Sequence, residues 1–463
     1  MKFFAATCFL LISIFTAVVV IKAETIFVSP GDSISDKIRL SESGDTIVIN
    51  KGSYNQKLII DKPLKIIGRG LPVINGGGKG TVIKALAPNT VIKGLKVTGS
   101  GSSLSVEDAG IDLENAPGSV LENNVLDDVL FGIYLKNSPG TLILNNKITG
   151  KELPLPERGD GIRLWYSSES EIIGNTVHSA RDLVIWWSGK TIIKDNVVSR
   201  GRYGLHYMYS NNNIFEDNRF SGNAVGGFLM YSENIQFFRN IFSGNRGMAS
   251  GYGVGFKDLD DVYAKDNLIV DNRVGVYMDN SPNLAGSWNK LSGNIIAYND
   301  IGVSMMPSIE RNLFDGNSFI DNFEQVEVRG GGVLEGNLWN AENRGNYWSD
   351  YRGFDENSDG LGDTPYKSEK LFEDIIDRNK TLRIFIYSPV TKAIELASEA
   401  FPVIKPLPKL TDKRPLIKPV VPLYMEKEKK SGSVVLLLFS LFLILVPILF
   451  YFNLIRQKDT GVC

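Results

Sequence analysis

A repeat of 21 or 22 residues constrains the fold of this chain more than any other feature of its sequence. The first recurring position of the repeat, its first mark, holds glycine in nearly every copy: Gly132, Gly161, Asp182, Gly204, Gly226, Gly253, Gly275 and Gly302. Its second mark is an asparagine fourteen residues after the first six of these: Asn146, Asn175, Asn196, Asn218, Asn240 and Asn267. Short β-branched segments lie between the marks, and inserted loops lengthen some repeats to 27 or 29 residues. This pattern predicts an all-β solenoid, a right-handed parallel β-helix with one coil of about 22 residues per repeat.

The recurring asparagine predicts a structural ladder rather than a catalytic site. An asparagine side chain can hydrogen-bond backbone groups at a turn, and copies on successive coils stack along the solenoid. Asn294 and Asn317 continue the series with small shifts, and we expect Asn123, Asn124 and Asn337 to extend it in both directions. Catalysis does not need so many copies, so we interpret these side chains as part of the fold.

Strand alternation separates the residues of each coil into an inward and an outward face. The column three positions after the glycine is apolar: Leu135, Leu164, Ile185, Tyr207, Leu229, Phe256, Met278 and Met305. We expect this column to form the core, with Met278 and Met305 as packing residues. At the amino end, we expect a short helix at Ser33–Leu40 to close the core.

The outward columns, two and four positions after the glycine, hold the rarer residues. The chain contains 2 His and 8 Met, yet His206, Met208 and Met230 fall together on two adjacent repeats. The outward positions around them are apolar or aromatic: Trp165, Trp186, Trp187, Val184 and Phe228. An outward apolar surface of this size predicts a binding site.

Two interpretations of this surface remain open. Thioether sulfur and imidazole nitrogen suit Cu(I), and an exported body without cysteine has no thiolate to offer instead. Met248, in the inserted loop before the next coil, is a candidate third thioether. The same surface also suits docking of a protein partner, with the anchors Trp165, Trp186, Trp187 and Phe228.

A second candidate site is the acidic loop that ends at Asp363. The oxygen-bearing side chains in this loop, with a glycine at the turn, match the first part of a calcium-binding loop. These side chains are Asp355, Asn357, Asp359 and Asp363. The bidentate glutamate expected at the twelfth position is replaced by Tyr366. The loop therefore predicts either a calcium site or a turn held by its own Asp and Asn side chains.

Both ends of the chain lie outside the repeats. Residues 1–23 have the charge and apolar run of a secretory signal peptide, so we expect an exported body. The apolar run over residues 431–454 is long enough for a transmembrane helix, which leaves residues 455–463 as a cytoplasmic tail. Between the ends we expect a β-helix with its amino-terminal cap (24–344), a carboxy-terminal module (345–400) and an extended tether rich in Pro and Lys (401–430).

Charge and cysteine content narrow the functions that this chain can have. The net charge is −2 and the sequence has no basic run, which argues against nucleic-acid binding. Once the signal peptide is removed, the one remaining cysteine is Cys463 in the tail. The exported body therefore has no disulfide, and its stability must come from a long core.

Six motifs follow one another along the chain in a fixed order. They are Arg202–Ser210 (RYGLHYMYS), Phe228–Ser232 (FLMYS), Tyr252–Lys257 (YGVGFK), Gly345–Asp350 (GNYWSD), Asp359–Tyr366 (DGLGDTPY) and Phe401–Ile404 (FPVI). This ordered set resembles the NosD family of periplasmic accessory proteins, and the resemblance runs from about Ile26 to Pro422. It is more specific than asparagine-rich coils, which many β-helices share.

The resemblance implies a non-enzymatic role in the maturation of nitrous oxide reductase. NosD proteins work outside the cytoplasm with an ABC transporter, made of the ATPase NosF and the membrane subunit NosY, and with the copper chaperone NosL. Together they supply copper or sulfur for the copper–sulfur cluster of the reductase. For this chain, the resemblance favours Cu(I) at His206, Met208 and Met230. The predicted membrane helix departs from the family pattern and implies a body anchored in the cytoplasmic membrane by its own carboxy-terminal helix.

Two other functional classes remain open. A carbohydrate-active enzyme of the polysaccharide lyase type would draw on Lys257, Asp258 and Asp279, the best such group in the sequence. The Gly-His-Gly motif of pectin-type hydrolases does not occur in the sequence. A surface adhesin or structural solenoid needs none of these residues, but it leaves the concentration of His and Met unexplained.

Overall fold

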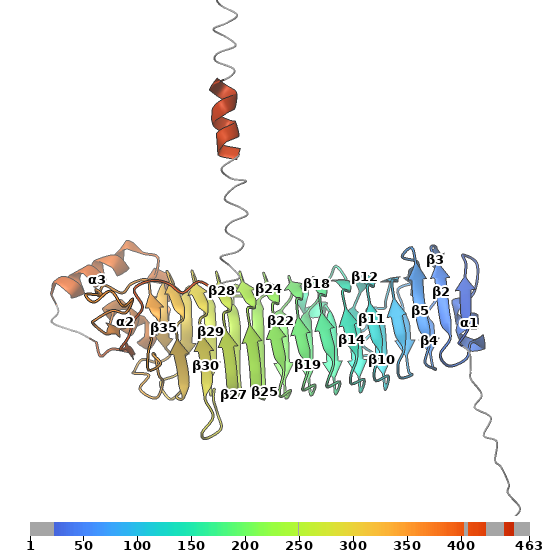
Figure 1. The fold of residues 1–463 in the computed structure, drawn as a ribbon, viewed down its shortest axis with the longest axis horizontal. Coiled ribbons are helices and arrows are strands. Elements are labelled where there is room, and N and C mark those ends of the chain that lie inside the picture. Colours follow the sequence, from blue (N-terminus) through green and yellow to red (C-terminus); the bar gives the residue numbers. More distant parts are fainter. Residues whose placement is uncertain (1–22, 249, 402–405, 423–438, 449–463) are drawn as a thin grey trace, which may run out of the picture.

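The computed structural model describes residues 23–248, 250–401, 406–422 and 439–448. The chain forms an elongated solenoid that runs from α1 (Ile34–Leu40) at one end to α2 (Leu371–Arg378) and α3 (Pro389–Ala400) at the other (Figure 1). Strands of successive coils pair in parallel, as predicted for a β-helix. The predicted signal peptide, residues 1–23, lies outside the described residues except for its last position.

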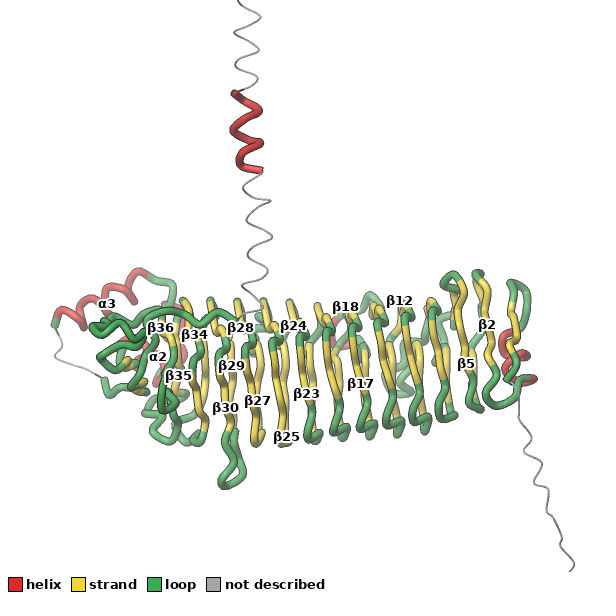
Figure 2. Tube along the Cα trace, viewed as in Figure 1, coloured by secondary structure: helices red, strands yellow, loops and turns green. Residues whose placement is uncertain are grey.

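Three stacks of strands form the walls of the solenoid (Figures 1 and 2). The first stack, which carries the candidate site, consists of β4 (Leu58–Ile60), β7 (Ile83–Ala85), β10 (Ala109–Glu114), β13 (Phe131–Lys136), β16 (Ile162–Trp165), β19 (Asp182–Trp186), β22 (Tyr203–Met208), β25 (Val225–Phe238), β27 (Tyr252–Lys265), β29 (Val274–Asp279), β32 (Ile301–Met305) and β35 (Glu324–Val328).

The second stack consists of β1 (Thr25–Val28), β2 (Thr46–Asn50), β5 (Lys65–Arg69), β8 (Val91–Lys93), β11 (Val120–Glu122), β14 (Leu142–Leu144), β17 (Glu171–Ile173), β20 (Ile192–Lys194), β23 (Ile214–Glu216), β30 (Asn289–Ser292) and β33 (Asn312–Asp315). The long strands β25 and β27 bend from the first stack into the second.

The third stack is a 13-stranded sheet with one short strand per coil. It consists of β3 (Ser53–Tyr54), β6 (Val73–Asn75), β9 (Lys96–Thr98), β12 (Val125–Val129), β15 (Lys147–Gly150), β18 (Thr176–His178), β21 (Val197–Ser199), β24 (Arg219–Ser221), β26 (Ile241–Ser243), β28 (Leu268–Val270), β31 (Ile295–Ala297), β34 (Ser318–Ile320) and β36 (Tyr347–Trp348). A 3-10 helix, η1 (Leu155–Glu157), lies in the loop before β16.

The predicted core column is buried along the whole stack. Its members, from Leu135 through Tyr207 to Met305, are at most 1% exposed and belong to one continuous apolar cluster. The prediction that Met278 and Met305 pack inside is confirmed, since neither has any exposed side chain. The amino-terminal cap is also confirmed: Ser33 Oγ accepts a hydrogen bond from Asp36 N–H, and α1 buries Ile34 and Ile38 over the first coils.

The predicted asparagine ladder is present, with two corrections. Side-chain amides donate to the next asparagine Oδ1 along Asn124, Asn146, Asn175, Asn196, Asn218, Asn240, Asn267, Asn294, Asn317 and Asn346. Asn337 does not extend this ladder, because it belongs to a separate one with Asn312 and Asn289. Asn123 is an exposed turn residue with φ 53°, a conformation that asparagine adopts readily.

A further asparagine ladder, which the sequence analysis missed, runs along a different corner of the solenoid. It consists of Asn223, Asn245, Asn272, Asn299 and Asn322. Each member follows a residue of the first ladder by five positions, so the same spacing would have revealed it. The two ladders satisfy buried backbone groups at two of the corners.

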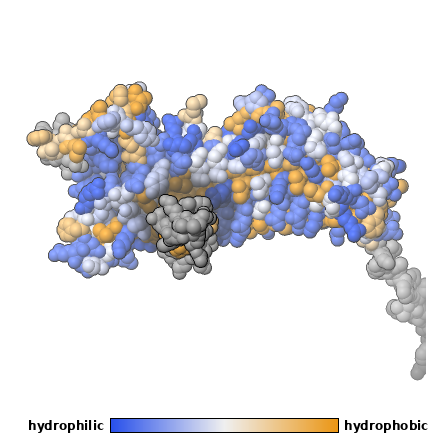
Figure 3. Space-filling model, turned by 90° about the horizontal axis from the view of Figure 1, so that it is seen from above, coloured by the Kyte–Doolittle hydropathy of each residue, from blue (hydrophilic) through white to orange (hydrophobic). Residues whose placement is uncertain are grey.

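In-register stacking also orders the outer surface. Because each coil repeats the previous one, residues of one kind form rows along the long axis. Seen from above, hydrophobic residues form such a band among hydrophilic ones (Figure 3).

The carboxy-terminal module begins inside the last coil rather than after it. Asn346 is the final member of the asparagine ladder, and Trp348 on β36 stacks on Phe319 with a centroid distance of 4.2 Å. Beyond this coil lie α2, the 3-10 helix η2 (Lys380–Phe385) and α3. The boundary predicted at residue 345 therefore cuts through a coil.

The segment predicted as an extended tether packs against the last coils where it is described, at residues 406–422 (Figure 2). Strand β38 (Thr411–Asp412) pairs with β37 (Tyr366–Lys367), and Asp412 accepts hydrogen bonds from Asn346 N–H and from the indole of Trp348. Farther along, Val420 N–H donates to Ser318 Oγ at 2.8 Å. A proline-rich strand loses little conformational entropy on docking, which explains why this composition suits a packed segment as well as a tether.

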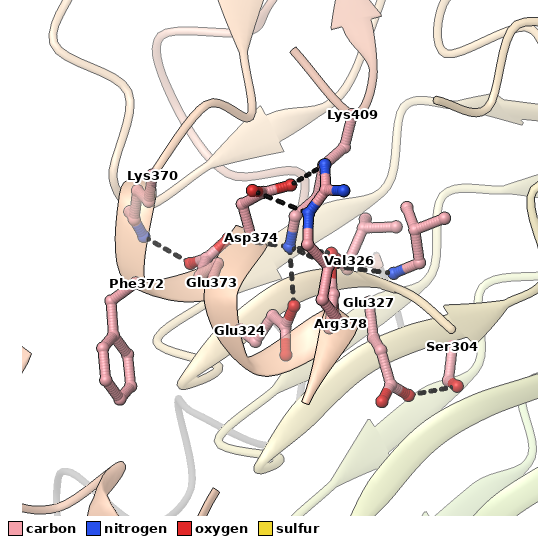
Figure 4. Close-up of polar contacts among 12 residues, drawn as sticks. Ser304, Glu324, Val326, Glu327, Lys370, Phe372, Glu373, Asp374, Arg378 and Lys409 are labelled. Carbon is pink, nitrogen blue, oxygen red and sulfur yellow. Dashed lines mark hydrogen bonds and ion pairs between the residues drawn. The ribbon is translucent and has the colours of Figure 1, made fainter. Parts of the chain in front are cut away.

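A buried ion cluster joins this segment to α2 and β35 (Figure 4). The Lys409 ammonium, 4% exposed, lies 2.7 Å from Glu324, 2.8 Å from Asp377 and 3.4 Å from Glu373. It also donates to the carbonyl of Val326. Burial lowers the pKa of Lys409, but the three carboxylates outweigh burial, and the net shift is upward.

Residues 439–448 are helical, but no helix within the part of the chain that the structure describes is long and apolar enough to cross a membrane. Most of the predicted membrane segment at 431–454 and all of the predicted tail at 455–463 lie outside the described residues.

Candidate functional site

His206 lies on β22, and its imidazole is held through one nitrogen. Nδ1 lies 3.1 Å from Oδ2 of Asp182, a buried carboxylate one coil earlier on β19. The rings of Trp186 and Tyr203 each lie with their centroid 4.9 Å from that of the imidazole. No hydrogen bond to Nε2 occurs among the described residues. A carboxylate on one nitrogen with the other left available is the usual arrangement of a metal-binding histidine.

Several hydrogen-bond donors keep the side chain of Asp182 ionised. Its oxygens accept hydrogen bonds from the backbone N–H of Tyr203 at 3.0 Å and from the guanidinium of Arg202. Burial raises the pKa of Asp182, but the hydrogen bonds from His206 and Arg202 outweigh burial, and the net shift is downward. The negative charge therefore persists and favours the orientation in which Nδ1–H of His206 points toward it.

Met208 and Met230 occupy the same position on adjacent coils, as register partners of β22 and β25. Both side chains are half-buried on the outward face. Neighbouring strands lie about 4.8 Å apart, and His206 precedes Met208 by two residues, or about 7 Å, on the same face of the strand. The structure thus gathers the predicted ligands His206, Met208 and Met230 in one small area.

Aromatic rings border the thioethers on one side. Trp165 and Trp186 precede Met208 in the same column, with ring centroids 5.7 Å apart, and Trp187 lies 4.6 Å from Trp165. At the adjacent corner, successive rings stack at 5.1–5.3 Å in a row that we term the aromatic ladder: Tyr166, Trp187, Tyr209 and Tyr231. The three tyrosines are between 39% and 50% exposed. Of these four residues, only Trp187 was predicted from the sequence to lie on the surface.

Phe228 lies on the other side of the thioethers, in a second row of stacked rings that we term the ring row: Tyr203, Phe228, Tyr252 and Tyr277. Val184 was expected in the exposed surface, but it is 1% exposed. Its register partners Arg163 and His206 have larger side chains, which cover it. Val184 is therefore part of the packing under the site rather than of its surface.

The structure does not bring Met248 to the other two methionines. Its side chain is 97% exposed, and its carbonyl accepts a hydrogen bond from Arg273. The preceding residue, Gly247, bonds the carbonyl of Ala224, just before β25 begins. Met230 lies six residues further along that strand, or about 20 Å away. Met248 would need a large loop movement to become a ligand.

The acidic loop at 355–363 uses its oxygens on its own backbone. Asp355 accepts from the N–H groups of Asp359 and Gly360, Asp359 from that of Leu361, and Asp363 from that of Glu356. Asn357 Oδ1 accepts from Asp359 N–H as well. Across the described residues, no three His, Cys, Asp or Glu side chains come together as a metal-binding group. These contacts favour a hydrogen-bonded turn over a calcium site.

The lyase-like residues form an ordinary surface ion pair. Lys257 Nζ lies 3.5 Å from Asp279, and Asp258 bonds the side chain of Asn280. Asp279 raises the pKa of Lys257, whereas a lysine that acts as a general base needs a lowered pKa. This geometry gives no support to lyase chemistry.

Known proteins resemble this chain in both sequence and fold. Residues 144–353, which include the candidate site, match the family described as "Periplasmic copper-binding protein (NosD)", and residues 36–177 match a "Right handed beta helix region". The probable ABC transporter binding protein NosD of Pseudomonas aeruginosa is 32% identical over 390 residues, which cover 79% of this chain and 87% of that relative. The chain belongs to the NosD family.

A second NosD protein, from Stutzerimonas stutzeri, is also described as a probable ABC transporter binding protein. It is 28% identical over 394 residues, covering 82% of this chain and 89% of the relative. Among solved structures, the Dettilon tailspike protein superposes with a TM-score of 0.50 at 16% identity, covering 67% of this chain and 70% of that one. At this identity the likeness to the tailspike concerns the fold alone.

Proposed function

We propose that this NosD-family chain is an exported accessory protein for the maturation of nitrous oxide reductase. In this proposal it works outside the cytoplasm with an ABC transporter, made of NosF and NosY, and with the copper chaperone NosL. It holds copper on its way to the copper centre of the reductase. The observation that carries the proposal is the outward group of His206, Met208 and Met230 on the NosD-type β-helix, with Nε2 of His206 available.

The chemistry of the donor set fits Cu(I). One imidazole nitrogen and two thioether sulfurs are the soft, neutral ligands that this ion prefers. Asp182 is occupied by Arg202, Tyr203 and His206, so it orients the imidazole rather than binding the metal itself. Bound copper would add a soft Lewis-acid centre at a partly exposed position on the outward face, where a partner's ligands can reach it.

The surroundings of the donors support a role in transfer between proteins. Trp165, Trp186 and Trp187 with the aromatic ladder lie on one side, and Phe228 lies on the other. Large half-exposed rings are typical anchors of protein interfaces, and they exclude water when a partner covers them. We assign this surface to the docking of a copper donor or acceptor. The apolar run at 431–454 would hold the body at the outer face of the cytoplasmic membrane.

The copper site is tested by titrating the full-length chain with Cu(I) against a competing chelator. Replacing His206 and Met208 together by alanine is expected to weaken binding by at least about 100-fold, because one thioether remains out of three ligands. The matched control replaces His178 and Met306 by alanine. His178 bonds Ser199 in a different stack, and Met306 is 42% exposed three coils beyond Met230. Equal affinity in the parent and in the His206→Ala, Met208→Ala chain would rule out this site.

A further inference from the structure

A cavity of about 540 Å³ lies beside the carboxy-terminal end of the ring row. Its floor is the outward face of β27, β29 and β32, represented by Tyr252, Tyr277 and Ser304. The 3-10 helix η2, with Lys380 and Arg383, forms the opposite wall. Small-molecule sites commonly have about this volume and lie where two structural units meet.

The cavity has more positive than negative charge. The lining includes four cations, Arg273, Arg329, Lys380 and Arg383, against two carboxylates, Asp300 and Glu327.

Both carboxylates already have ion-pair and hydrogen-bond partners. Asp300 pairs with Arg246 and accepts from the hydroxyl of Tyr387. Glu327 lies 3.1 Å from Arg383 and accepts from Ser304 (Figure 4). Neither carboxylate therefore compensates the charge of Arg273 or Arg329.

The two remaining guanidiniums have only neutral partners within the described residues. Arg273 donates to the carbonyl of Met248. Arg329 donates to the hydroxyl of Tyr277 and the carbonyl of Met278, lies 4.4 Å above the Tyr277 ring, and keeps its Nε–H without an acceptor. Arg273 is exposed, whereas Arg329 is half-buried. A partly desolvated guanidinium without a carboxylate, such as that of Arg329, gains most from an anionic ligand, and Arg273 adds a second positive charge to the same cavity.

Both guanidiniums lower the pKa of the same hydroxyl, that of Tyr252. Burial and the neighbouring Tyr277 raise the pKa of Tyr252 to about 12, although Arg329 and Arg273 each lower it. The hydroxyl therefore stays protonated at neutral pH and can donate a hydrogen bond. It adds a neutral donor to the lining that the two arginines share.

Part of the remaining lining is apolar. Val274, Ile301, Phe323 and Ile386 contribute side chains to the same cavity. Val274, Ile301 and Ile386 expose only small apolar areas to the cavity, whereas Ile384 in the same lining is 80% exposed. A bare oxyanion would leave these apolar areas in contact with water, whereas an organic ligand would cover them. The lining therefore matches a ligand with one anionic end and one apolar end.

We propose that this cavity binds a small organic anion, with its carboxylate or sulfonate between Arg273 and Arg329 and its apolar part against Val274, Ile301 and Ile386. The ligand approaches between η2 and the β-helix wall. Its binding links the carboxy-terminal module to the coils, because the two sides of the cavity belong to these two parts.

Isothermal titration of the full-length chain with hexanoate and with 1-hexanesulfonate tests the proposal, with 1-hexanol and inorganic sulfate as comparison probes. The organic anions are expected to saturate at a single site and to bind at least about tenfold more tightly than either comparison probe. Arg273→Gln is expected to weaken binding at least about tenfold, since it removes one charge-assisted contact. Lys190→Gln, on an exposed coil far from the cavity, is the matched control and should bind like the parent.

Arg329→Gln is the second variant, and its melting temperature without ligand is measured first because Arg329 packs on Tyr277. The increase in melting temperature caused by hexanoate is expected to vanish in this variant and to persist in Lys190→Gln. Two results would overturn the proposal: neither organic anion saturates by about 10 mM, or both bind Arg273→Gln as tightly as the parent.

Discussion

Replacing Lys409 by methionine is expected to release the carboxy-terminal segment at 406–422 from the last coils. The substitution removes the ammonium that faces Glu324, Glu373 and Asp377 and leaves buried carboxylates with too little positive charge. Breaking a buried ion cluster from one side usually costs about 3–5 kcal/mol. Methionine has a similar length, so packing changes little and the effect reports on the charge.

Hydrogen exchange measures this release locally. In Lys409→Met the amides of α2 and of β38 should exchange faster, while those of the central coils, such as β19 and β22, keep their protection. Lys413→Met is the control, because Lys413 is exposed in the same segment. Unchanged protection in α2 and β38 would mean that the ion cluster does not hold the segment in place.

Replacing Asn240 by alanine is expected to lower the free energy of unfolding by about 3–5 kcal/mol. The side chain accepts from the N–H and the side-chain amide of Asn218 and donates to Phe215 O and Asn267 Oδ1. Alanine leaves several of these buried groups without that partner, and each unsatisfied group costs about 1–3 kcal/mol. Because coils stabilise one another through their neighbours, the loss weakens the stack on both sides.

Urea denaturation followed by circular dichroism measures the effect of Asn240→Ala. Asn55→Ala is the control, since Asn55 is exposed, and its effect should remain within about 0.5 kcal/mol. A loss below about 1 kcal/mol in Asn240→Ala would contradict the structural role of the ladder.

The interior of the solenoid is predictable from the sequence because every coil repeats the same local geometry. Strand alternation places Tyr207 and Met278 inside and Met208 outside, and each residue lies where this rule predicts. The rule says less about how outward neighbours cover one another, which is why Val184 is buried between Arg163 and His206.

Corners of the coils fall outside the alternation rule. The aromatic ladder residues Tyr166, Trp187, Tyr209 and Tyr231 all have positive φ, between 47° and 53°. A residue in this conformation belongs to neither face of a strand, so its exposure cannot be read from the period of two. The orientation of His206 by Asp182 likewise depends on two coils being in register, across 24 residues of sequence.

The docking of the carboxy-terminal segment at 406–422 on the last coils is the least predictable part of the fold. Lys409 meets Glu324 across 85 residues, and no repeat relates the two positions. Proline and lysine in this region are equally typical of a free tether, so composition alone does not reveal the docking. The cavity beside η2 depends on how the carboxy-terminal module packs on the same coils. For this reason, neither the docked segment nor the cavity could be predicted from the sequence.

The most direct test of the proposed function measures copper in the reductase itself. The chain is co-expressed with the nitrous oxide reductase and the transporter of its own genome, and copper is counted per purified reductase. We predict that the parent chain and the His178→Ala, Met306→Ala control yield reductase with its copper–sulfur cluster, and that the His206→Ala, Met208→Ala chain, present at the same level, yields reductase without it. A full cluster in the presence of the His206→Ala, Met208→Ala chain would contradict the role of this surface in copper supply.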